Sequence, residues 1–571
     1  MGQLYAVEGS PPRCTPCDRG KLSFFLVADE DEEKFLGPAV HHKPLHRLYS
    51  YMRMAQARTL VREDAFAPFS PFKRDDEALG RRLDRPGIRS SWVRLSFFRT
   101  EFNRPEDIRF MSEEDYLGYA ILRGVESENV LQIWESVIRH DPIINNYLHT
   151  LNIYDGYVGS EANGKPFRVR GSYYAQQNNL TSVCAHVALQ TLLNDGLYER
   201  GKDIIRAEDM NVALGINHTT NKLGRHGRDE YGTLSTGQVL TLLRKKYNLE
   251  VHRYTFAPTK QLDYAAFLYP YIESCCGCLL AFGRPVRDGG TVDHVVPVIG
   301  HTFNSDLWFP EAGLAYLNVP DEPNIVLDSR QWVDHFLIHD DNYGIYMCLP
   351  AHCLDSESHY CEGRPRGGTR ATDPASRRPS LARHAFAVVP SDVQTYPQTA
   401  RRYAARVLYD LKKRITDPRP MWLKEVLMAV NQAQPEEEKG HHALTRAPVM
   451  RTLLVSKQQL LAHWDNIGAF NKLDGQKQQV EREIAPYVWL VEVSISEVFT
   501  ANRAKVVDIA MNAVGHFSES ASPWRVCCAI RVPGEFILPN CSGGEKRLAT
   551  EEPRGYADVF RHARTPVTLE R

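Results

Sequence analysis

The chain has 571 residues, of which 43% are hydrophobic and 10% aromatic, enough apolar side chains for several packed cores. Its 69 lysines and arginines balance 70 aspartates and glutamates, so electrostatics give no reason to expect nucleic acid or an anionic membrane as a partner. No run of about 18 apolar residues and no signal-peptide pattern occurs, so we expect no membrane association.

The 12 cysteines are scattered or adjacent, which is typical of a reducing compartment and predicts a cytoplasmic protein. Cys14 and Cys17 have the two-residue gap of a metal knuckle, but no regular second half of a zinc site follows. The run Cys275, Cys276 and Cys278 is too crowded for three ligands to reach one tetrahedral ion. We therefore predict no metal and no cofactor.

Residues 1–165 are predicted to form an N-terminal α+β domain without a catalytic constellation. Alternating or apolar runs predict strands at Lys21–Ala28 and Ser91–Phe98. Ser112 followed by three acidic residues (113–115) before an apolar run, and the apolar face of Asn129–Arg139, predict two helices. We expect this domain to support the fold or to bind a partner protein.

A second domain is predicted at residues 166–355, and its key stretch is Gly171–Gly196. Here an amide-rich loop leads into a helix with Cys184 in its first turn and with Thr181 or Ser182 as candidate N-cap. The positive end of a helix stabilises a thiolate, so a cysteine at this place is a candidate nucleophile.

Two glutamines, Gln176 and Gln177, precede this cysteine and are candidate oxyanion donors. The structural alternative is a buried cysteine beside a polar loop. Further elements of this domain are predicted at a helix over 234–247 capped by Ser235 or Thr236, and at strands over Leu249–Phe256, within Tyr271–Phe282, over Thr291–Gly300 and over Tyr343–Leu349.

A cysteine hydrolase also needs an imidazole and a group that orients it. His294, near the start of an apolar strand, is the candidate base, and its neighbour Asp293 points to the other side of that strand. Across the following turn, Asp306 is the preferred orienting residue, with Asn304 as the alternative and Glu311 in reserve. His186 and His301 are interpreted as structural residues.

The order of a glutamine, a cysteine at a helix start, a Leu-Ser-x-x-Gln-Val helix, an apolar strand and then a histidine before apolar residues resembles the papain-like cysteine peptidases. The chain is most similar to the bacterial peptidases that cleave double-glycine leader peptides. The resemblance covers about residues 165–350 and maps the oxyanion-hole glutamine to Gln177, the nucleophile to Cys184 and the base to His294. Ala185 stands where the family has glycine.

The segment 356–383, rich in Gly, Pro, Ser, Thr and Arg, predicts a flexible linker, and residues 384–571 predict a C-terminal α+β domain. Its predicted elements are a helix at Thr399–Ile415 and strands at Tyr487–Ser496 and Trp524–Val532. In the last strand, one of the adjacent residues Cys527 and Cys528 is expected to face the core and the other to face outward.

The resulting fold prediction is α+β, with a papain-like cysteine peptidase core flanked by two further α+β domains. The predicted function is a cysteine peptidase or isopeptidase that cleaves a peptide-type bond through a thioester on Cys184. A protein or peptide is the expected substrate, and the flanking domains are candidate partner-binding regions. The alternatives are a catalytically inactive papain-like scaffold that binds a protein partner, and a papain-like acyltransferase.

Overall fold

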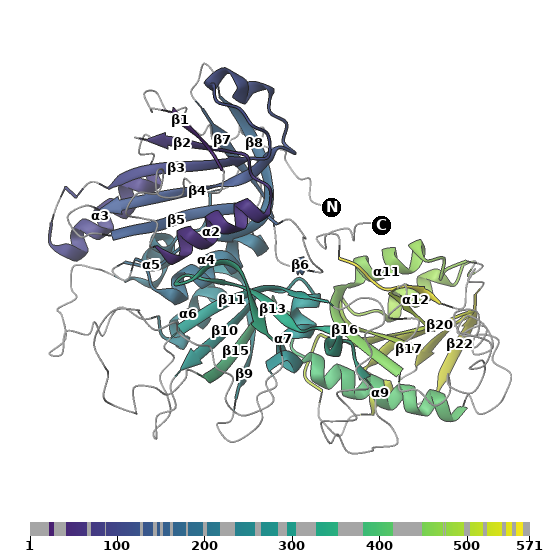
Figure 1. The fold of residues 1–571 in the computed structure, drawn as a ribbon. Helices are drawn as coiled ribbons and strands as arrows, with labels where there is room; N and C mark the ends of the chain where they lie inside the picture. Colours follow the sequence, from purple (N-terminus) through teal and green to yellow (C-terminus); the bar gives the residue numbers. More distant parts are fainter. Residues whose placement is uncertain are drawn as a thin grey trace, which may run out of the picture.

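The protein is described here by a computed structural model, shown in Figure 1. Within the described residues, no helix is both long and apolar enough to cross a membrane. The described residues are 22–27, 42–64, 70–85, 87–88, 90–125, 130–140, 146–148, 152–159, 164–178, 181–197, 203–216, 234–256, 264–283, 294–303, 327–351, 381–414, 448–471, 473, 475–495, 499, 503–517, 522–539, 544–550 and 556–562.

The described chain is mixed α+β and is built around three seven-stranded sheets whose strands are mostly antiparallel (Figure 1). The first sheet has the strand order β1-β2-β3-β4-β5-β8-β7. Its strands are β1 Leu22–Leu26, β2 Thr59–Asp64, β3 Ser91–Phe98, β4 Tyr116–Val125, β5 Val130–Arg139, β7 Asn152–Val158 and β8 Lys165–Tyr174.

Two predicted helices of the N-terminal region are strands in the structure. The first helix was expected to start at residues 112–115, but residues 113–115 form a turn and strand β4 follows them. The second, expected at Asn129–Arg139, is strand β5. Every residue of β5 from 132 to 138 is buried, because both faces of this sheet are covered. A strand buried on both faces loses the apolar-polar alternation that would identify it, so its apolar run was mistaken for a helical face.

The central sheet has the order β14-β13-β11-β10-β15-β9, and β6 also pairs with β11. Strand β11 begins at His294 and pairs antiparallel with β10 on one side and β13 on the other. The strands of the central sheet are β6 Asn146–Leu148, β9 Leu249–Thr255, β10 Cys278–Gly283, β11 His294–Thr302, β13 His335–Asp340, β14 Gly344–Pro350 and β15 Leu381–Pro390.

The third sheet has the order β12-β16-β17-β19-β20-β21-β22, and a separate ribbon pairs β18 with β23. These strands are β12 Leu327–Asp328, β16 Pro448–Ser456, β17 Tyr487–Ile495, β18 Ala504–Lys505, β19 Val507–Asn512, β20 Cys527–Val532, β21 Glu535–Pro539, β22 Glu545–Ala549 and β23 Ala557–Asp558. Both cysteines at the start of β20 are buried, one in each of the cores on the two faces of the sheet, so the prediction that one would face outward is wrong.

The helices pack against the sheets, and α4 packs between two of them. Helix α4 packs between the first sheet, at β7 and β8, and the central sheet, at β11, while α7 and α9 pack against β16 of the third sheet (Figure 1). The described α-helices are α2 Lys43–Met54, α3 Ser70–Leu83, α4 Cys184–Leu197, α5 Ala207–Leu214, α6 Thr236–Thr241, α7 Tyr264–Glu273, α9 Pro397–Arg414, α11 Lys457–Asn466, α12 Lys477–Glu483 and α14 Pro523–Val526; a π-turn (η5, Leu242–Lys246) extends α6, and two 3-10 turns are η2 Pro105–Phe110 and η6 Ser329–Trp332.

The predicted domain boundaries do not follow the sheets. Strand β8, which crosses the boundary at 165/166, belongs to the first sheet, and β15, which crosses the boundary at 383/384, pairs with β9 and β10 of the central sheet. The central and third sheets also share one hydrophobic core, to which Val296 and Trp489 both contribute. Composition shows where the chain changes character, but not which sheet a strand joins.

Candidate active site

Helix α4 begins at Cys184, as the sequence predicted. The carbonyl of Val183 accepts from His186 N at 2.8 Å and from Val187 N at 3.3 Å, so Val183, rather than Thr181 or Ser182, precedes the first helical residue. Valine has no side-chain oxygen with which to cap the helix. The N–H groups of the first turn, beginning with Cys184, therefore point out of the helix end without a partner from the helix itself.

The two expected capping residues have another role, which is to close the loop before the helix. Asn178 Oδ1 accepts from Thr181 N at 2.8 Å and from Ser182 N at 3.0 Å. The hydroxyl of Ser182 accepts from Asn178 N at 3.1 Å in return. This compact turn fixes the backbone that leads into Cys184.

The structure distinguishes the two candidate oxyanion glutamines. Gln176 is held by its neighbours: its Oε1 accepts from Ile133 N at 3.1 Å, and its Nε2 lies 3.1 Å from His42 Nε2. The side chain of Gln177 is half-buried and, within the described residues, makes no hydrogen bond. Gln176 thus serves as a structural anchor, and Gln177 is the glutamine with a free amide.

His294 is the first residue of β11 and is only 4% exposed. Its side chain forms a hydrogen bond with Cys184, which the packing of α4 on β11 brings into reach. Burial by itself would lower the pKa of His294, but the hydrogen bonds to Asp340 and Cys184 and the charges of Asp340 and Asp341 hold the pKa well above its usual value. The environment of the ring therefore favours its protonated form.

Asp340 is the last residue of β13 and orients the imidazole. Its Oδ2 lies 3.2 Å from His294 Nε2, and its Oδ1 accepts from Asn342 N at 2.8 Å and Tyr343 N at 3.2 Å. The side chain is 0% exposed. Because one carboxylate oxygen is bonded to the turn, the other is fixed on the ring, and Nδ1 remains the nitrogen available to Cys184.

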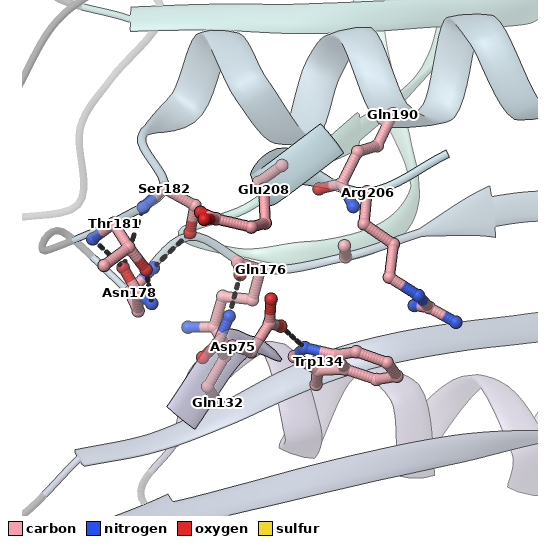
Figure 2. A pocket seen from close by; sticks show the side chains of 12 residues that line it. Asp75, Gln132, Trp134, Gln176, Asn178, Thr181, Ser182, Gln190, Arg206 and Glu208 are labelled. Carbon is pink, nitrogen blue, oxygen red and sulfur yellow. Dashed lines mark hydrogen bonds between the residues drawn. The ribbon is translucent and has the colours of Figure 1, made fainter. Parts of the chain in front are cut away.

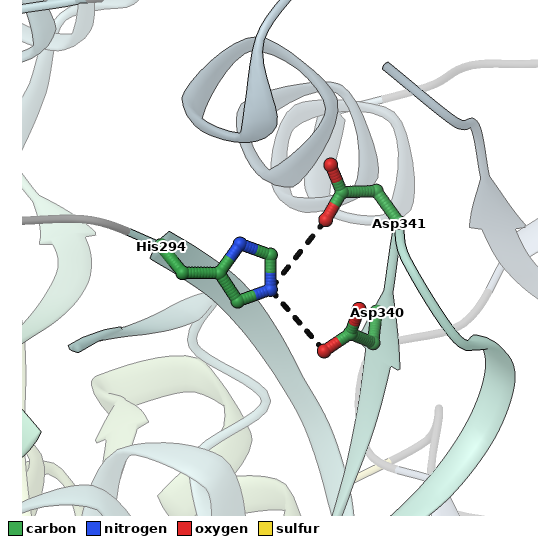
Figure 3. Close-up of side chains that lie close together, drawn as sticks. All are labelled: His294, Asp340 and Asp341. Carbon is green, nitrogen blue, oxygen red and sulfur yellow. Dashed lines mark hydrogen bonds and ion pairs between the residues drawn. The ribbon is translucent and has the colours of Figure 1, made fainter. Parts of the chain in front are cut away.

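A second carboxyl group approaches the same ring nitrogen. Asp341 Oδ1 lies 3.5 Å from His294 Nε2, and Figure 3 shows both aspartates directed at that nitrogen, Asp340 from the end of β13 and Asp341 from the turn that follows. Within the part of the chain that the structure describes, neither oxygen of Asp341 has a hydrogen-bond partner, although the residue is only 4% exposed. Burial raises the pKa of Asp341 to about 7; the charge of His294 opposes this rise and that of Asp340 adds to it.

The residues predicted to orient His294, namely Asp306, Asn304 and Glu311, lie outside the described residues. Asp340 and Asp341, which contact the ring, were not considered from the sequence. Asp340 follows the base by 46 residues, because β12 and its flanking chain separate β11 from β13. A polar His-Asp-Asp-Asn run directly after the apolar strand residues 336–338 is the signal that indicates them.

The first sheet contacts both helix α4 and the loop that leads into it. Next to its start, Gln176 N donates to Ile133 O on β5 at 2.8 Å. Toward its end, Asp195 accepts from Tyr154 Oη and from Tyr173 N, each at 2.8 Å, and also from the hydroxyl of Ser172. The N-terminal region is thus part of the support of the candidate site.

A small polar cavity lies behind the loop that contains Gln176, Asn178 and Ser182 (Figure 2). Its volume is about 20 Å³, which is room for about one water molecule. Asp75 lines it, accepts a hydrogen bond from Trp134 Nε1, and has its pKa raised by burial. The cavity is too small for a substrate and belongs to the support of the loop.

The two histidines interpreted as structural make buried hydrogen bonds away from the thiol. His186 Nε2 lies 2.9 Å from Asn211 Oδ1 on α5, and His301 Nε2 lies 2.9 Å from Glu273 Oε1. The crowded cysteines are also unsuited to chemistry, because burial raises the pKa of Cys276 and Cys278 above the usual range. Cys184 is the described cysteine that has a histidine beside it and starts a helix.

The ligand atoms of His294, Asp340 and Asp341 lie within 4.8 Å of one another, so these residues could hold a metal ion. The chain matches no protein-family model, no curated protein and no solved structure.

Proposed function

We propose that the protein is a papain-like thiol hydrolase, a cysteine peptidase or isopeptidase in which Cys184 attacks a peptide-type carbonyl. The observation that carries this proposal is the hydrogen-bonded series Cys184, His294 and Asp340, with the cysteine at a helix start and the aspartate buried on the far side of the ring. Nucleophile, base and orienting group are the three parts of a cysteine-hydrolase centre.

In this mechanism the proton of the thiol passes to Nδ1 of His294, and the resulting thiolate attacks the carbonyl carbon. The N–H of Cys184 and the amide of Gln177 are the proposed donors to the oxyanion. The imidazolium returns its proton to the departing amine, which leaves a thioester on Cys184. A water molecule, deprotonated by the imidazole, then hydrolyses the thioester and restores the thiol.

The first test needs no knowledge of the substrate. Wild-type protein is treated with a limiting amount of iodoacetamide in the presence of a chelator, and the labelled cysteines are quantified by peptide mass spectrometry. We expect Cys184 to react at least about 10-fold faster than the exposed Cys348, because the helix end and the imidazolium stabilise its thiolate. Equal rates at the two cysteines would refute the proposal.

The second test measures cleavage of a peptide library and of partner proteins. Cys184→Ala should abolish cleavage, and the matched variant Cys348→Ala should retain it, since Cys348 is exposed on β14. Product masses in the presence of amine acceptors distinguish hydrolysis from acyl transfer: a free acid indicates a hydrolase, and an amide adduct indicates a transferase. Cleavage that survives Cys184→Ala would exclude this nucleophile.

A further inference from the structure

The cluster around His294 contains more negative charge than a thiol hydrolase requires. Asp340 suffices to orient the ring, since its two oxygens are bonded to the ring nitrogen and to the turn. Asp341 adds a second buried carboxyl group whose two oxygens have no hydrogen-bond partner among the described residues. Its contact with His294 is an ion pair at 3.5 Å, and a buried carboxyl group without hydrogen bonds is costly, so its presence at this place needs an explanation.

The spacing of the three ligand atoms matches a metal site. His294 Nε2 is 3.2 Å from Asp340 Oδ2 and 3.5 Å from Asp341 Oδ1. A tetrahedral ion with bonds of about 2.0–2.1 Å separates its ligand atoms by about 3.4 Å. Figure 3 shows the two carboxylates of adjacent residues directed at one nitrogen, so a cation between them would give the oxygens of Asp341 a further contact.

Charge and ligand type agree with this geometry. Two carboxylates and a neutral imidazole carry a net charge of about −2, which one divalent cation neutralises without a change in the fold. The turn amides of Asn342 and Tyr343 bond the outer oxygen of Asp340 and hold its inner oxygen in place, as second-shell donors do in metal sites. A nitrogen and two oxygens in a buried site suit zinc, cobalt or manganese better than calcium.

We propose that His294, Asp340 and Asp341 bind a divalent transition-metal cation of the zinc class, and that this cation reversibly inhibits the thiol chemistry of the site. The inhibitory half rests on the proposed function; the binding half does not. With Nε2 on the cation, the ring has one proton left, at Nδ1. Its transfer to a departing amine would leave an imidazolate, so the ring no longer serves as the general acid.

The binding half is tested by titrating chelator-treated full-length protein with Co²⁺ and following its visible absorption. We expect about one site per chain, with binding weakened by at least about 10-fold in Asp341→Asn, because that variant loses a ligand charge. Cys184→Ala and Asp334→Asn, which changes an aspartate at the other end of β13, should bind like the wild type. Equal binding by Asp341→Asn would overturn the proposal.

A measurement on the wild type covers the case in which Asp341→Asn does not fold. Zinc-loaded protein is examined by X-ray absorption at the zinc edge, where we expect nitrogen and oxygen ligands without sulfur. Sulfur in the coordination shell would assign the ion to cysteines and reject the site.

The inhibitory half is tested by peptide cleavage with and without added zinc, each rate divided by that of the same variant in chelator. We expect the wild type to lose activity on addition of zinc and Asp341→Asn to need at least about 10-fold more zinc. Zinc binding in a protein with no cleavage activity would reject the proposed function and keep the site. Cleavage that is unaffected by bound zinc would reject the inhibitory half.

Discussion

The substitution Asp340→Asn tests how the turn after β13 controls the imidazole. The carboxylate oxygen Oδ1 accepts two backbone N–H bonds, from Asn342 and Tyr343, while Oδ2 faces His294 Nε2 at 3.2 Å. An asparagine side chain has one oxygen, and this oxygen would accept the two hydrogen bonds from the turn N–H groups of Asn342 and Tyr343. The amide NH₂ would then face Nε2 and donate to it, which stabilises the ring tautomer with its proton on Nδ1.

That tautomer cannot accept the proton of Cys184 at Nδ1. Hydrogen bonds to charged groups contribute about 1.5–3 kcal/mol, and each 1.4 kcal/mol corresponds to about a factor of 10. Loss of the bond between imidazolium and Asp340 should therefore reduce the thiolate population, and with it the alkylation rate of Cys184, by about 10- to 100-fold. Peptide cleavage, which also uses the imidazolium as an acid, should fall by at least as much.

The assay is the rate of Cys184 alkylation by iodoacetamide at pH 7 in chelator, followed by mass spectrometry. Cys348 serves as the internal control, because its rate should not change. Thermal unfolding confirms that the variant is folded. An Asp340→Asn protein that alkylates at Cys184 within about 2-fold of the wild-type rate would refute the argument that Asp340 orients the ring.

Three further outcomes concern stability. Burial lowers the pKa of His339 to about 3, whereas the value in the unfolded chain is about 6.5. The unfolded chain therefore binds more protons as the pH falls below about 6.5, and His339 should lower the unfolding free energy by about 1.4 kcal/mol at pH 5.5 relative to pH 7.5. Urea unfolding at the two pH values measures this difference, with His339→Gln as the control. Arg451→Met removes the guanidinium that pairs with two buried glutamates, which still contact His301 and Lys505, and should cost about 3 kcal/mol, whereas Arg168→Met, at an exposed ion pair, should leave the unfolding midpoint nearly unchanged. Gly171→Ala places a Cβ 2.2 Å from a backbone oxygen and should destabilise the protein by about 2 kcal/mol or more. Gly196→Ala, on α4 where the added Cβ meets no atom within 4 Å, should stabilise it by up to about 1 kcal/mol. A higher unfolding temperature for Gly171→Ala than for Gly196→Ala would contradict both predictions.

Elements whose signals are local were predicted well from the sequence. The helix that begins at Cys184, the strand that begins near His294 and the helix capped by Ser235 are all present, and the structure adds a capping box between Ser235 and Gln238. In each case the deciding residues lie within one turn or one strand of the feature. Helix caps and apolar runs carry their information at short range.

Features that depend on distant packing were predicted less well. Strand β5 was mistaken for a helix because both its faces are buried in the first sheet. Strand β15 was assigned to a linker and a C-terminal domain, although it pairs in the central sheet with strands more than 100 residues earlier. Nothing in a strand's own residues states which other strands it will join.

The sequence itself indicated the cysteine and the histidine of the candidate site. Cys184 at a helix start and His294 on an apolar strand are identified by residue type and local pattern, and the hydrogen bond between them agrees with that pairing. The tertiary structure decided the rest: Gln176 is fixed by β5, which leaves Gln177 free, and Asp340 and Asp341 reach the ring through the pairing of β11 with β13. The physical reason is that orientation of an imidazole depends on groups brought close by strand pairing, and their separation along the chain has no fixed value.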